Sequence, residues 1–206
     1  MPKASAKPHK QPVQSRSQLT VQAILEAAIQ VFEAHGHAGG TTARIAERAG
    51  VSIGSLYQYF PNKDAILHCL ADQHLSDADA AASRLLAYAG SAQPSLIEAI
   101  DLMVDGFMLL HRQNPVLHRL LYEEGLLSAE LRERARRVQD QHTEALADLL
   151  AQHPQVRSSN PALQAYFVVE MVEHFTHQLV IAPPAQTLPM LTDELKRLLL
   201  GYLAKT

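Results

Sequence analysis

Residues 41–60 read TTARIAERAGVSIGSLYQYF, and this stretch decides the fold of the N-terminal part of the chain. Thr41 and Ser52 each precede a short run with helical spacing, and both residue types are favoured N-caps. Gly50 lies between the two runs, where a tight turn needs a positive φ angle. The stretch therefore predicts two short helices joined by a turn. This arrangement is typical of a helix-turn-helix, whose second helix is free to enter a major groove.

The outward face of the second short helix carries small or aromatic hydrogen-bonding side chains without charge, which are Ser52, Ser55, Tyr57, Gln58 and Tyr59. Gly54 lies in the same helix, where glycine costs about 1 kcal/mol relative to alanine. That cost is understandable if the backbone must approach another molecule closely. Taken singly, each residue also fits an ordinary surface or cap position, and each tyrosine fits half-buried packing. Together they predict an interface with DNA.

Charge is distributed unevenly along the chain. Seven basic and three acidic residues give residues 1–63 a formal charge of +4, and the total of −3 leaves −7 for the remainder. A basic part on an acidic body favours an anionic partner for the first part, with chance clustering as the alternative. Residues 1–16 contain no acid and almost nothing apolar. We expect them to form a disordered basic arm that lies along DNA or acts as a solubilising tail.

The rest of the chain is dominated by apolar residues at helical spacing, with no strand pattern and no internal repeat. A first helix should run from Leu19 to about His35, and a long helix should follow its cap at Asn62. The segment 90–94, which contains Gly90 and Pro94, should break the chain. Later helices are expected over 95–113, 129–152, 162–181 and 188–203.

These patterns predict an all-α protein of about nine helices. A three-helix helix-turn-helix domain should occupy residues 17–62, after the arm. A larger helical regulatory and dimerisation domain should occupy residues 63–206. The helix over 63–88 would link the two domains.

The block RIAERAGVSIGSLYQYFPNKDAIL at 44–67 resembles the DNA-binding domain of the TetR/AcrR family of transcriptional repressors. The similarity covers about residues 20–68, and its G-V-S-x-G-x-L-Y-x-Y-F-x-x-K spacing is specific for that domain. It implies phosphate contacts from polar and basic side chains, namely Thr42, Ser52, Tyr57, Tyr59 and Lys63. It also implies base-edge contacts from Ile53, Gly54 and Ser55, with Gln58 and Arg44 as further DNA contacts. Gly40 departs from the family pattern, because many relatives carry threonine there.

The resemblance further implies a homodimer that binds a palindromic double-stranded operator and is released by a small-molecule effector. In this family the last two helices usually form the dimer interface. Their apolar stripes here are Leu163, Phe167, Met171, Phe175 and Leu179, followed by Leu188, Leu191, Leu195, Leu198 and Leu199. A single intramolecular core would produce the same stripes, so the sequence leaves both explanations open.

Flexible and aromatic side chains on the middle and later helices favour an apolar ligand cavity. The candidate ligand contacts are Met103, Phe107, Met108, His111, Tyr122, Phe167, Met171 and His174. Ordinary core packing would use the same residue types. The effector expected for such a cavity is a mostly apolar molecule with one or two polar groups.

Other functions have weaker support. His174 and His177 could present two metal ligands from one helix, but no cysteine lies near them and no third ligand is obvious, so we predict neither a metal site nor a cofactor. No phosphate-binding loop, nucleophile elbow or dinucleotide motif is present, so we predict no catalytic residue and no enzyme.

A helical adaptor that binds another protein remains an alternative, and salt-sensitive, fragment-selective binding to DNA would exclude it. A single cysteine, Cys69, and the lack of any apolar run of membrane-spanning length favour a cytoplasmic protein with no membrane partner.

Overall fold

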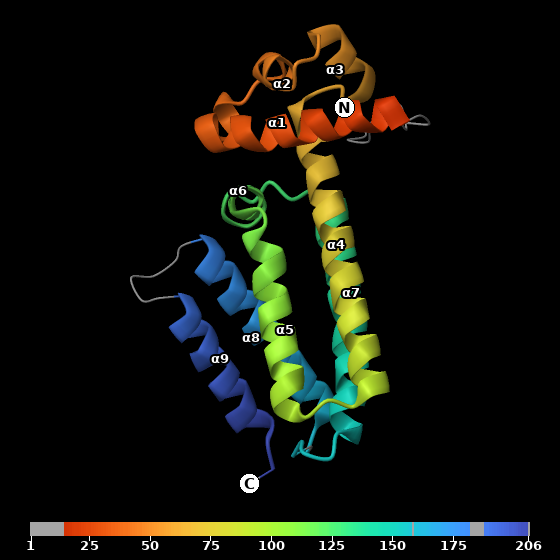
Figure 1. The fold of residues 1–206 in the computed structure, drawn as a ribbon, viewed down its shortest axis with the longest axis vertical. Helices are drawn as coiled ribbons and strands as arrows, with labels where there is room; N and C mark the ends of the chain where they lie inside the picture. The colour runs from red at the N-terminus through yellow and green to blue at the C-terminus, as the bar shows by residue number, and fades with distance from the viewer. Residues whose placement is uncertain (1–14, 158, 182–187, 206) are drawn as a thin grey trace. The chain divides into compact units, whose positions relative to one another are not determined.

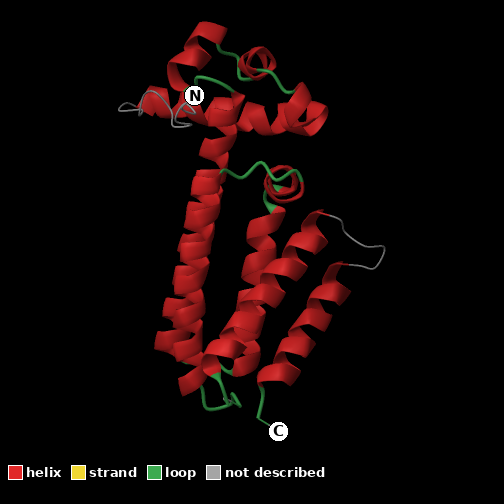
Figure 2. Ribbon diagram, turned by 180° about the vertical axis from the view of Figure 1, so that it is seen from behind, coloured by secondary structure: helices red, strands yellow, loops and turns green. Residues whose placement is uncertain are grey.

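The structure is a computed structural model that describes residues 15–157, 159–181 and 188–205. The described residues form nine α-helices and one π-helical turn, without a strand (Figure 2). The all-α class predicted from the sequence is confirmed. The predicted arm over 1–16 lies outside the described residues, except that Ser15 and Arg16 belong to the first helix.

The chain forms two compact units. The N-terminal unit runs to His74 and includes the later segment Arg119–Ser128, whereas the C-terminal unit comprises Leu75–His118 and the residues from Ala129 onward. The units therefore divide within a helix, and the predicted domain boundary after residue 62 stays a prediction.

The N-terminal unit begins with three helices, α1 (Ser15–Gly39), α2 (Thr42–Arg48) and α3 (Ile53–Tyr59). α2 packs against both α1 and α3, as Figure 1 shows. The first part of α4 (Lys63–Ala92) and the π-helical turn η1 (Arg119–Glu123) also belong to this unit.

Local hydrogen bonds explain where these helices begin. The side-chain oxygen of Thr41 accepts from the Arg44 amide at 3.3 Å, and that of Ser52 accepts from the Ser55 amide at 3.0 Å. Asn62 caps α4 in the same way, since its Oδ1 accepts from the Ala65 amide at 2.8 Å. Each cap satisfies an N–H group that the first helical turn leaves without a partner in the helix. The three predicted caps are confirmed.

Two glycines in the stretch from α1 to α3 adopt positive φ angles, and the sequence predicted this for Gly50. Gly36 interrupts α1 with a φ angle of 67°, and Gly50 forms the turn between α2 and α3 with a φ angle of 66°. A side chain at either position would be strained, because L residues rarely adopt this conformation.

Gly40, which departs from the family pattern, is required by packing. A Cβ atom at this position would lie 2.7 Å from Cδ1 of Phe32, whose side chain is fully buried. The aromatic ring therefore occupies the space that a threonine would need. Phe32 belongs to a core contributed by all four helices, whose largest members are Ile24, Phe32, Ile45, Leu56, Phe60 and Ile66.

We expect Gly40→Thr to lower the free energy of unfolding by about 1–3 kcal/mol, because the added atoms overpack the Phe32 pocket. Urea unfolding without DNA measures the change. Gly54→Ala is the matched control, because its Cβ would meet only the Ser52 hydroxyl, at 3.9 Å. Equal stability of Gly40→Thr and wild type would show that Phe32 moves without loss.

The C-terminal unit combines the second part of α4 with α5 (Leu96–Arg112), α6 (Pro115–His118), α7 (Ala129–Gln152), α8 (Pro161–Ile181) and α9 (Leu188–Leu203). α8 is central to the packing, since it contacts α5, α6, α7 and α9. Ser95 begins α5 with a capping box, in which its side chain accepts from the Glu98 amide and the Glu98 carboxylate accepts from the Ser95 amide.

The expected chain break over 90–94 is confirmed, but it begins only after Ala92, because α4 continues through Gly90. A glycine inside a helix costs only about 1 kcal/mol, which tertiary contacts can offset. Gly90 lies against α7, where its Cβ would be 3.6 Å from a methyl group of Leu149. The helix ends just before Gln93, whose φ angle is 50°, and Pro94.

The apolar stripes of the last two helices divide between the interior and the surface. Leu179, Leu195 and Leu199 are buried in a core shared with α5 and α7, and Met171, Leu188 and Leu191 pack against that core. The exposed apolar side chains of the two helices are Leu163, Tyr166, Phe167, Phe175, Met190, Leu198 and Tyr202, which we call the α8/α9 patch. Throughout the described parts of the chain, no helix is long and apolar enough to cross a membrane.

Candidate DNA interface and ligand cavity

The exposed face of α3 carries the residues that the sequence singled out. The side chains of Ile53 and Tyr57 are large and apolar yet 42% and 47% exposed, and Gln58 beside them is also exposed. Gly54 is exposed as well, and no other atom of the protein crowds it closely. Its absent side chain thus serves no internal packing, which fits a backbone that another molecule approaches.

Hydrogen bonds already order the polar groups of this face. The Thr42 and Tyr57 hydroxyl oxygens lie 3.0 Å apart, which joins α2 to α3. The hydroxyl oxygens of Ser52 and Ser55 lie 2.8 Å apart, beside the cap that Ser52 makes. Ser55 and Tyr59 are partly buried, so each offers only part of its surface to a partner.

The two basic candidates hold the end of α1. Nη1 of Arg44 donates to the Gly39 carbonyl at 2.6 Å, and Nζ of Lys63 donates to the carbonyls of His37 and Ala38. Carbonyl groups at a helix C-terminus attract cations. Arg44 and Lys63 therefore have a structural role that the sequence reasoning missed, and both lie in the same unit as α3.

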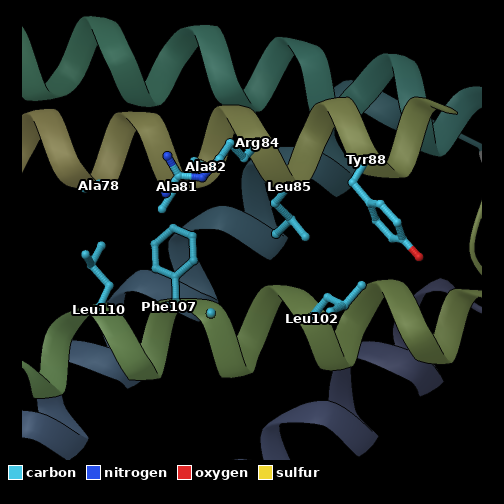
Figure 3. Close-up of a pocket in the computed structure, with 10 residues that line it drawn as sticks. Ala78, Ala81, Ala82, Arg84, Leu85, Tyr88, Leu102, Phe107 and Leu110 are labelled. Atoms are coloured by element: carbon cyan, nitrogen blue, oxygen red, sulfur yellow. The ribbon is translucent and has the colours of Figure 1, made fainter. Parts of the chain in front are cut away.

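A cleft of about 360 Å³ separates α4 from α5 in the C-terminal unit. Figure 3 shows Leu85 of α4 and the ring of Phe107 of α5 both directed into it, with Tyr88 and Leu102 farther along the cleft. The alanines on α4 and Gly106 on α5 have small side chains or none, so they leave the space between the two helices open. The volume lies in the range of small-molecule sites.

A second cavity, of about 100 Å³, adjoins the first and shares Leu85, Tyr88, Leu102 and Phe107 with it. Most of its lining is also apolar, and Met103 contributes to it. Apart from Tyr88, its polar lining residues come from α7 and α8, and they are Gln139, His142 and Glu173.

Glu173 is the most unusual of these polar groups. Burial, reinforced by the negative charge of Glu170, raises the pKa of the Glu173 carboxyl to about 7. Nε2 of Gln139 donates to Oε2 of Glu173 at 3.0 Å and to Oε1 of Glu170 at 3.2 Å. Near neutral pH both protonation states are therefore accessible. The ionised carboxylate can accept a hydrogen bond or bind a cationic group, and the protonated carboxyl can donate a hydrogen bond.

The raised pKa of Glu173 predicts that folding stability falls as pH rises. Between the ordinary pKa of 4.5 and about 7, the unfolded chain releases this proton and the folded chain retains it. The stabilisation is complete below pH 4.5 and is lost as pH rises through about 7. Its upper limit is on the order of 3 kcal/mol.

We expect Glu173→Gln to remove this part of the pH dependence, as measured by urea unfolding near about pH 5 and about pH 8. Glu144→Gln is the control, because Glu144 is an exposed carboxylate on α7. An unchanged pH slope in Glu173→Gln would show that the carboxyl titrates normally.

Family comparisons agree with the arrangement of both units. The family description "Bacterial regulatory proteins, tetR family" matches residues 24–70, and "Tetracyclin repressor-like, C-terminal domain" matches residues 95–203. The chain belongs to the TetR family. It is thus a transcriptional regulator, and the regulators of this family are not enzymes. The resemblance drawn from residues 44–67 is confirmed.

Curated relatives of this TetR-family chain match only part of it. The transcriptional repressor SCO4008 of Streptomyces coelicolor is 33% identical over 104 residues, which are 50% of this chain and 48% of the relative. The tetracycline repressor protein class C of Escherichia coli is 38% identical over 60 residues, 29% of this chain and 27% of the relative. The chain thus matches less than half the length of these relatives.

Solved structures share the fold over most of this TetR-family chain. The fatty acid degradation regulator FadR of Bacillus halodurans has a TM-score of 0.67 at 20% identity, covering 93% of this chain and 97% of FadR. FadR of Bacillus subtilis, solved in complex with stearoyl-CoA, has a TM-score of 0.65 at 20% identity, covering 88% and 98%. These identities support the shared fold alone.

The structure separates the ligand contacts predicted for this TetR-family chain. Met103 and Phe107 line the cavities, whereas Met108 is buried in the core and Met171 packs against it. Phe167 and His174 are exposed on α8, and neither lines the cavities described above. Tyr122 belongs to the N-terminal unit, in η1. His111 lies in a cluster with His118 and His177.

Several cavity residues were not predicted from the sequence. The sequence places Leu85 and Tyr88 only within a long helix, and Gln139 and Glu173 come from helices that meet only in the folded chain. Gly106 is the residue that could have indicated the cavity from the sequence. Glycine is unfavourable within a helix, so its presence there suggests that a ligand or another element occupies the space of a side chain.

Proposed function

We propose that this TetR-family regulator is a repressor that binds a palindromic double-stranded operator as a homodimer, and that a mostly apolar small molecule releases it. The exposed, uncharged hydrogen-bonding face of α3, with Gly54 open to solvent, carries the proposal. α4 contributes residues both to the N-terminal unit and to the cavity wall. A shift of this helix on effector binding could therefore change DNA binding.

The contacts to DNA follow from the chemistry of each group. Tyr57, Tyr59, Thr42 and Ser52 carry hydroxyls, and Lys63 an ammonium, that suit phosphate oxygens and would position the protein. Ser55 and Gln58 carry donors and acceptors that can read base edges. Ile53 at the start of α3 can contact a thymine methyl group. Arg44 would reach DNA only by releasing or sharing its bond to the Gly39 carbonyl.

Selection of bound fragments from random DNA by the full chain tests the proposal. We expect a palindromic consensus and affinity that falls steeply with salt. Gln58→Ala should reduce the discrimination between bases at its contact position by about 1–3 kcal/mol. Tyr57→Phe should lower the affinity for all sequences by a similar factor. Salt-insensitive or sequence-independent retention of DNA would contradict the proposed function.

The α8/α9 patch supports the homodimer. An edge-to-face contact joins Phe167 of α8 to Tyr202 of α9, with ring centroids 6.4 Å apart, and both side chains are exposed. Large apolar side chains grouped on two adjacent helices are unfavourable in water. A second copy of the same patch is the natural partner, since a two-fold axis would place two reading heads on a palindrome.

The lining of the two cavities indicates the chemistry of the effector. Apart from Arg84 in the first cavity, their walls accept an apolar chain or ring, and Glu173 offers a carboxylate at the polar part of the second cavity. An amphipathic amine fits this combination, because its ammonium group would favour the ionised form of Glu173. FadR of Bacillus subtilis, which was solved with stearoyl-CoA, is a related fold that accommodates an acyl ligand.

A further inference from the structure

Three histidines from separate helices meet in the C-terminal unit. His111 of α5, His118 of α6 and His177 of α8 have ring centroids 4.4 Å apart for His111 and His118, 4.8 Å for His111 and His177, and 5.4 Å for His118 and His177. His118 is fully buried, His111 is buried and His177 is partly buried. The helices α5, α6 and α8 pack against one another, so the cluster belongs to the core of this unit.

The hydrogen bonds of His111 define its tautomer. Its Nδ1 lies 2.8 Å from the Phe107 carbonyl oxygen, which can only accept, so Nδ1 must carry the proton. In the neutral ring the lone pair is then on Nε2, and this atom faces Nε2 of His177 at 3.0 Å. A ring that donates one N–H to a backbone carbonyl and presents the other nitrogen is the usual arrangement of a metal-ligating histidine.

We propose that His111, His118 and His177 bind a divalent first-row transition metal ion. A metal held ~2.1 Å from each imidazole nitrogen places ring centroids about 4.6–5.3 Å apart for ligand angles between right-angled and tetrahedral. The His111–His177 separation of 4.8 Å lies within this range, and those of 4.4 and 5.4 Å lie within about 0.2 Å of its limits. The 3.0 Å between the two Nε2 atoms also suits two ligands of one ion.

The ligand set selects the class of metal. Imidazole nitrogens favour zinc, nickel, cobalt and copper over the oxygen-seeking magnesium and calcium ions. Binding requires His177 to carry its proton on Nδ1, a change of tautomer that leaves both rings neutral. The ion would lie close to the proposed effector cavity, because the ring of Phe107, which lines that cavity, stacks on His111 with centroids 5.7 Å apart.

Titration of the full chain, first freed of metal with a chelator, tests the proposal with Zn²⁺ by calorimetry and with Co²⁺ by visible absorption. We expect one ion per chain. His111→Ala and His177→Gln should each weaken binding by more than about 100-fold, since even outer-shell partners contribute ~10–100-fold. Circular dichroism verifies that the variants fold.

His174→Ala is the matched control, because His174 is exposed on the same helix, three residues before His177. This variant should bind the metal as wild type does. Absence of binding to the wild-type chain would overturn the proposal and leave the cluster as a hydrogen-bonded packing element. Equal losses in His174→Ala and His177→Gln would place the metal elsewhere. Neither measurement uses DNA, so its result is independent of the proposed operator binding.

Discussion

Leu198→Glu should convert the protein to a monomer and weaken binding to its selected operator by at least about 10³-fold, approaching nonspecific affinity. Leu198 is 54% exposed on α9 within the α8/α9 patch, so the substitution adds a charge to the proposed dimer contact without disturbing the core. A lone reading head contacts only one half-site, so it loses the contribution of the second half. Sedimentation gives the mass, for which one chain is 22.7 kDa, and a mobility shift gives the affinity.

Leu109→Glu is the control for this experiment. Leu109 is 67% exposed on α5 and does not belong to the patch, so the same charge there should leave both mass and operator affinity unchanged. A Leu198→Glu protein that remained a dimer would show that the two copies meet through another surface. If the control alone dissociated, the proposed interface would be wrong.

Gly106→Phe should abolish release from the operator by an amphipathic amine. Gly106 lines the cleft between α4 and α5, and a Cβ atom built on it meets nothing within 4 Å. A phenyl group there would occupy the space that an effector needs. Typical coupling between ligand and DNA is ~1–3 kcal/mol, so the ligand should lower the operator affinity of wild type by about 5–150-fold. The operator affinity of Gly106→Phe should not change with the ligand.

Decylamine is a suitable probe, with decanoate as its anionic counterpart. Wild type should respond to decylamine more strongly than to decanoate, because the Glu173 carboxylate attracts an ammonium group and repels another carboxylate. By reciprocity, saturating operator must weaken decylamine binding by the same factor, which calorimetry can measure. Gly106→Ala is the control, because one methyl group leaves most of the cleft open.

Release of Gly106→Phe by decylamine at the wild-type concentration would show that the effector binds elsewhere. Equal responses of wild type to decylamine and decanoate would remove the role assigned to Glu173. Without ligand, Gly106→Phe and Gly106→Ala should both bind the operator as wild type does, since Gly106 is not among the residues of the N-terminal unit.

The sequence by itself determined the helix-turn-helix, because its signals act over a few residues. Thr41, Ser52 and Asn62 cap amides only three residues away, and Gly50 supplies a φ angle that other residues rarely adopt. Such interactions are readable from spacing alone. The helices expected over about 129–152 and 188–203 correspond to α7 and α9, because apolar side chains at helical spacing are also a local signal.

Only the tertiary structure decided which apolar or polar side chains meet. The stripe on α9 reads as one apolar series, yet Leu195 and Leu199 are buried and Leu198 is exposed, because the rotation of the helix against α5 and α8 determines which side faces water. His111 and His177 are 66 residues apart, and their contact depends on how α5 and α8 cross. Spacing within one helix pairs His177 only with His174, a pair for which we predicted no metal site. The contact with His111 comes from packing between helices, which carries no local sequence signal.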